Sequence, residues 1–166
     1  YSGQPLRSTI RDSLYSFKNY ANGNVFYLNL YHEFDVPKYI KSIDFDLIIF
    51  HTTFMSFRWW GGEDFFQNKI IKKCEFFISS AAQKAIMPQD EWIHTSYLVK
   101  FVNILKINQV FSVAPQSEWK KIYSGVEFNK VQFYQILTGY IDDNLLNKIN
   151  KIKEQGVTKS VDIGYR

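Results

Sequence analysis

The chain has 166 residues, the length of one domain or of one half of a two-domain protein. At 46% hydrophobic and 18% aromatic residues it can bury a sizeable core, a composition that argues against disorder. No apolar run approaches the roughly 20 residues of a membrane-spanning helix. The net charge of +4 comes from dispersed basic residues without a zinc-finger or RNA-binding signature, so we expect no nucleic-acid partner.

The single cysteine, Cys74, excludes an internal disulfide, which is consistent with a cytoplasmic protein. We expect no metal, because no two histidines have ligand spacing. Small groups of lysines occur at helical spacing, such as Lys148, Lys151 and Lys153. A solvated helix face is the favoured interpretation of such groups, and peripheral contact with an anionic membrane surface is the lesser one.

Hydrophobic periodicity and turn residues define the predicted elements. In chain order we predict helix 5–21, strand 25–31, helix 37–43, strand 46–52, helix 63–80, strand 84–87, helix 94–107, strand 110–113, helix 117–124, strand 131–137 and helix 142–155. Ser117 is the expected N-cap of its helix. The alternation predicts an α/β fold with a doubly wound parallel sheet of about five strands and helices on both faces.

Parallel strands place their carboxyl ends at one edge of the sheet, where open α/β sheets bind ligands. His51 ends the most hydrophobic strand, and its near-neutral pKa would suit a general base. The alternative for His51 is a buried histidine with a satisfied hydrogen bond. Gly61 and Gly62 precede a helix, where a plain turn is favoured over phosphate binding.

The segment Pro88–Trp92 follows the third predicted strand and is rich in polar groups. Asp90 and Glu91 are candidates for orienting a base or binding hydroxyls, with an N-cap or first-turn role as the alternative. Gln89 and His94 flank them as candidate substrate contacts, with a solvated histidine at the start of the helix as the favoured alternative for His94.

Four segments together resemble bacterial glycosyltransferases of the two-domain GT-B architecture. They are Asp46–His51 with Arg58 beyond it, Pro88–Trp92, Leu137–Tyr140 and Asp162–Arg166. The resemblance implies that residues 1–166 are the N-terminal, Rossmann-like half, with residues 156–166 leading to a donor-binding domain in cis. This half would bind the acceptor, a saccharide or another hydroxyl compound, with Arg58, Thr138 and Gly139 lining the cleft.

The resulting hypothesis is an acceptor-side domain of an enzyme that moves a sugar from a nucleotide-sugar to an acceptor hydroxyl. His51, Asp90 and Glu91 are its catalytic candidates. The donor is a substrate bound mainly by the other domain, so no cofactor is expected, and the isolated domain should be inactive or nearly so. The alternative hypothesis is a non-catalytic binding or interaction module of flavodoxin-like topology.

Overall fold

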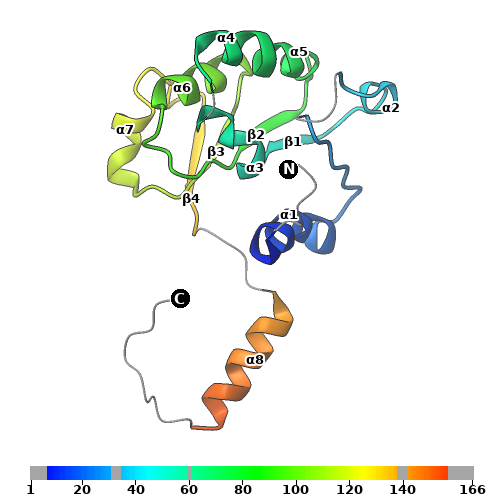
Figure 1. The fold of residues 1–166 in the computed structure, drawn as a ribbon, viewed down its shortest axis with the longest axis vertical. Coiled ribbons are helices and arrows are strands. Elements are labelled where there is room, and N and C mark those ends of the chain that lie inside the picture. The colour runs from blue at the N-terminus through cyan, green and yellow to red at the C-terminus, as the bar shows by residue number, and fades with distance from the viewer. Residues whose placement is uncertain (1–6, 31–34, 60, 138–141, 157–166) are drawn as a thin grey trace. The chain divides into compact units, whose positions relative to one another are not determined.

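The computed structural model describes residues 7–30, 35–59, 61–137 and 142–156 (Figure 1). Contacts group the chain into two compact units. The larger unit is Val25–Thr138, and the smaller one combines Tyr1–Asn24 with Gly139–Arg166. The predicted single domain over residues 1–166 stays a prediction, and its link at 156–166 lies outside the described residues except for Gly156.

The smaller unit contains two helices, α1 (Ser8–Tyr20) and α8 (Asp143–Glu154), at the predicted places. Asp142 caps α8, because its carboxylate accepts hydrogen bonds from the backbone N–H groups of Asn144 and Leu145. Neither helix contains a buried residue, so neither contributes side chains to a core within its own unit.

The larger unit has four parallel strands in the order β1-β2-β3-β4. They are β1 (Leu47–Phe50), β2 (Gln83–Ile86), β3 (Gln109–Ser112) and β4 (Gln132–Gln135). They correspond to four of the five predicted strands, which confirms an α/β fold with a parallel sheet. Each strand is short. Apolar side chains, β-branched or aromatic, occur at alternate positions and pack one face of the sheet onto the core.

In the larger unit, one helical segment precedes β1, and the others connect successive strands (Figure 1). They are α2 (Lys38–Lys41), α3 (Thr52–Met55), the 3₁₀ helix η1 (Ser56–Trp59), α4 (Glu63–Phe65), the π-helical η2 (Phe66–Ile71), α5 (Lys72–Ile78), α6 (Thr95–Ile104), the 3₁₀ helix η3 (Gln116–Glu118) and α7 (Trp119–Ile122). Residues 53–59, which lie between the predicted strand 46–52 and the predicted helix 63–80, are helical. Ser117 is not an N-cap, because η3 already starts at Gln116.

Residues 25–30, which belong to the predicted strand 25–31, do not form a strand. Leu30 is buried in the core, and its carbonyl accepts a hydrogen bond of 2.6 Å from Nζ of Lys73. Only Leu30 of this segment is buried, Phe26 and Tyr27 are exposed, and a lysine side chain occupies a main-chain acceptor that a neighbouring strand would use. The fifth strand is not confirmed among the described residues.

The helices cover one face of the sheet. The register aligns one residue from each strand on that face: Phe50, Ile86, Val110 and Phe133. Phe50 contacts Phe101 of α6, with ring centroids 5.1 Å apart, and Phe133 contacts Trp119 of α7 at 5.3 Å. A sequential strand order with right-handed crossovers puts all connecting helices on the same side. The doubly wound arrangement with helices on both faces is therefore not confirmed.

Candidate functional site

The polar segments that follow β1, β2 and β3 start from the same edge of the sheet, because the strands are parallel. Their first residues are His51, Met87 and Val113. The strand order does not reverse among the described strands, so no crevice of the kind found at a switch point forms between them. A site at this edge must therefore be built by the loops themselves.

His51 is the N-cap of α3, and its Nδ1 lies 3.3 Å from the backbone N–H of Thr53, from which it accepts a hydrogen bond. The side chain is 7% exposed, and burial lowers the pKa of His51 from 6.5 to about 4. The imidazole is therefore neutral at neutral pH and its ring is oriented by the cap. Its predicted role as a base stays a prediction, although a group with so low a pKa is a weak base at that pH.

Arg58 is 1% exposed and lies beneath the edge instead of lining a cleft. Its guanidinium donates hydrogen bonds to the carbonyl oxygens of Ile93, at 2.9 Å, and of Gln89, at 2.5 Å. Its Nε donates to the carbonyl of Met55 at 3.2 Å. One buried side chain thus joins η1, which follows β1, to both ends of the loop after β2.

Burial lowers the pKa of Arg58, while the nearby Tyr123, Glu91 and Asp90 act in the opposite direction. An arginine keeps its proton through such changes, since its ordinary pKa is above 12. Arg58 is therefore a buried cation whose guanidinium contacts carbonyl oxygens of the chain and not solvent.

Glu91 is fully buried and accepts hydrogen bonds from four residues. Its donors are the hydroxyls of Ser112 and Tyr123 and the backbone N–H groups of Val113 and Ala114. Burial and the charge of Glu91 raise the pKa of Tyr123, so the phenol stays protonated and donates. Glu91 therefore ties the loop after β2 to the end of β3, away from any ligand at the surface.

The capping alternative for Asp90 and Glu91 is wrong. Helix α6 begins at Thr95, and its N-cap is His94, which makes no side-chain capping bond. The two acids lie in the loop before the helix and outside its first turn.

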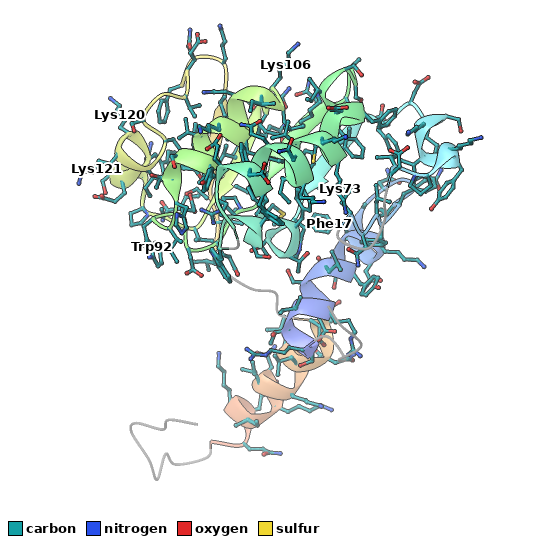
Figure 2. The ribbon with its side chains drawn as sticks, turned by 45° about the horizontal axis from the view of Figure 1, so that its top comes forward. Phe17, Lys73, Trp92, Lys106, Lys120 and Lys121 are labelled. Atoms are coloured by element: carbon teal, nitrogen blue, oxygen red, sulfur yellow. The ribbon has the colours of Figure 1, made fainter. Side chains whose placement is uncertain are left out.

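Asp90 and His94 have φ values of 48° and 49°, in the left-handed region that residues other than glycine rarely adopt. Such conformations cost about 1–3 kcal/mol each and cluster at functional sites. Trp92, between them, is 67% exposed and lies at the periphery of the larger unit (Figure 2). The loop is thus held in a strained shape from below by Arg58 and Glu91, and it presents an indole ring to solvent.

The remaining predicted contacts are distributed as follows. Gln89 and Asp90 are half-buried and His94 is exposed. All three lie in the loop after β2. Thr138 and Gly139 lie outside the described residues. Gly61 has a φ of 74°, and a Cβ there would lie 2.6 Å from Cβ of Phe65, so a tight turn explains this glycine without a phosphate.

The loop anchored by Arg58 and Glu91 was not evident from the sequence. Arg58 and Glu91 are 33 positions apart, and nothing in their spacing indicates that both are buried. The run of polar residues around Trp92 in Pro88–Trp92 was the available signal, and it does not indicate which of these side chains are buried.

Over the described part of the chain, no three His, Cys, Asp or Glu side chains gather closely enough to hold a metal ion. Cys74 is buried, and burial raises its pKa to about 12, which makes a thiolate nucleophile unfavourable. Every helix in the described ranges is too short or too polar to cross a bilayer.

Comparison of the chain with protein-family models, with curated proteins and with solved structures gave no match in any of the three.

Proposed function

We propose that this chain is the acceptor-binding domain of a sugar-transferring enzyme, with the acceptor on the loop Pro88–His94. The observation that carries the proposal is the strained conformation of this loop around the exposed Trp92, fixed by two fully buried charged residues. A rigid loop that presents an aromatic ring and a carboxylate is suited to a sugar ring, whose apolar face stacks and whose hydroxyls donate. The resemblance of four segments to GT-B glycosyltransferases points the same way.

In this proposal the indole of Trp92 stacks on the acceptor ring and Asp90 accepts a hydrogen bond from one of its hydroxyls. Gln89 and His94 supply further polar contacts. Arg58 and Glu91 act as positioning residues. The side chain of Arg58 donates to main-chain carbonyls, and that of Glu91 accepts from buried donors. The nucleotide-sugar belongs to a second domain in cis.

The proposal is tested by saturation-transfer NMR and titration calorimetry, with lactose and chitobiose as probe saccharides. We expect Trp92→Ala to weaken saccharide binding about tenfold through loss of the stacked ring, and Trp92→Phe to retain most of it. Asp90→Asn should also weaken binding about tenfold, since a hydrogen bond to a charged group contributes about 1.5–3 kcal/mol.

The matched control is Tyr39→Ala, which removes an equally exposed aromatic ring, 61% accessible, from α2 ahead of β1. This variant should bind the saccharides like the unaltered chain. Absence of saturation transfer from any protein resonance, or an equal loss in Tyr39→Ala and Trp92→Ala, would contradict the proposal.

A further inference from the structure

Strand β4 is an edge of the sheet, and its outer side carries no strand among the described residues (Figure 1). The backbone N–H groups of Gln132 and Ile136 donate to β3, to the carbonyls of Asn108 and Ser112. Because main-chain groups alternate in direction along a strand, those of Phe133 and Gln135 point outward. At both Phe133 and Gln135, β4 therefore has an outward-pointing backbone N–H that can donate and a carbonyl that can accept.

The residues of β4 and those next to it lack the sequence features that normally prevent strand pairing. Residues 131–137 contain no charge, no proline and no glycine. Natural edge strands are usually protected by lysine, proline, a bulge or a covering segment.

A groove of about 540 Å³ lies beside β4. It is lined by residues from β4, from α7 and from the segments flanking them: Gln116, Trp119, Lys120, Phe128, Val131, Gln132, Phe133 and Tyr134. Its lining contains several aromatic rings and no carboxylate, so it is suited to an apolar side chain that comes from outside the sheet edge.

Leu137 is 90% exposed, more than any other large hydrophobic residue in the described ranges. It lies two residues beyond β4, and an extension of the strand to residue 137 on pairing would give it the same facing as Val131 and Phe133, which line the groove. One end of this edge thus has an exposed leucine, and the other end has a groove lined by both aromatic and polar side chains.

We propose that two copies of this chain pair through β4 in antiparallel fashion, about a twofold axis at Tyr134. In this register Tyr134 faces Tyr134 of the partner subunit, and Phe133 faces Gln135 of the partner subunit. Both members of the second pair have outward-pointing main-chain groups and can exchange hydrogen bonds.

The same register places Val131 opposite Leu137 of the partner subunit, so the exposed leucine of each copy enters the groove of the other. Shifting the axis by one residue, to Phe133, leaves Leu137 beyond the groove. The twofold symmetry makes the contact closed, so pairing ends at two copies and uses the β4 edge of each copy. The inference does not depend on the proposed sugar-binding loop.

Sedimentation velocity over a concentration series tests the pairing. We expect a reversible monomer–dimer equilibrium whose dissociation constant rises at least about tenfold in Leu137→Asp, which puts a charge into the groove. Gln135→Pro should also abolish the dimer, because it removes an outward N–H and leaves the ladder to β3 intact. Tyr39→Lys, which changes an exposed aromatic residue on α2, is the matched control and should dimerise normally.

Cysteine crosslinking tests the register. The native Cys74 is fully buried, so an introduced surface cysteine is the reactive one. Tyr134→Cys should form a disulfide-linked dimer on mild oxidation, since residues directly opposite in antiparallel strands have Cβ atoms about 4.5–5.5 Å apart. Gln132→Cys should not, because its counterpart lies four positions away along the pair. A chain that stays monomeric at every concentration, or one that crosslinks through residue 132 and not 134, overturns the proposal.

Discussion

Glu91 is a predicted catalytic residue, and the structure places its carboxylate among buried hydrogen-bond donors. A carboxylate can only accept hydrogen bonds, and all four of its partners are donors. An amide in its place would direct an N–H₂ group at donors. We expect Glu91→Gln to lower the free energy of unfolding by about 2–4 kcal/mol, as measured by urea denaturation.

The matched control for this change is Glu63→Gln. Glu63 is exposed and pairs with Lys100 at 2.7 Å, and such surface pairs contribute about 0–1 kcal/mol. Equal losses of stability in the two variants would show that Glu91 is not held as the structure describes.

His51 gives a prediction about pH. Its pKa is about 4 in the folded chain against 6.5 when unperturbed, so the unfolded chain takes up a proton first as the pH falls. Stability contributed by the neutral imidazole is present above about pH 6.5 and is lost toward pH 4. Between about pH 7 and about pH 5 the loss from this group should be about 2 kcal/mol.

The variant His51→Asn separates this titration from the cap. Asparagine is a good N-cap residue and does not titrate, so the variant should lose about 2 kcal/mol less stability than the unaltered chain over the same interval. Urea denaturation at both pH values measures the difference. Identical pH dependences for the two proteins would exclude a depressed pKa at His51.

At the level of elements, the two adjacent glycines before α4 have different roles. Gly61 combines a φ of 74° with a close approach to Phe65, whereas a Cβ at Gly62 would meet nothing within 4 Å. Gly61→Ala should therefore destabilise the chain by about 1–3 kcal/mol, and Gly62→Ala should change it little. Thermal denaturation of the two variants makes the comparison, and a larger effect at Gly62 would contradict this account of the turn.

Helices with regular apolar spacing were predicted well, and so were the four short strands, because burial on one face leaves a visible pattern. The segment 25–30 was mispredicted for a reason that local sequence does not reveal. Its leucine and aromatic residues favour a strand, but Lys73, more than forty positions later, takes the carbonyl of Leu30. Strand formation depends on which partner is available, and that is a tertiary property.

At the level of the whole molecule, strand order decides what the larger unit can bind. A doubly wound sheet would have a switch-point crevice, and the sequential order observed here has none among its four strands. Polar groups at the carboxyl edge therefore depend on the anchored loop Pro88–His94 for their geometry. The same order makes β4 an edge among the described strands, and the proposed pairing rests on that edge.

The sequence by itself determined the α/β class, four of the strands and the edge at which polar residues gather, because periodicity and parallel direction are properties of local pattern. The tertiary structure decided which of those residues face solvent. From their residue types, Arg58 and Glu91 could equally be charged residues on the surface. Only the packing shows that both are buried while Trp92 is exposed. Burial is set by contacts between distant segments, which no single stretch of sequence contains.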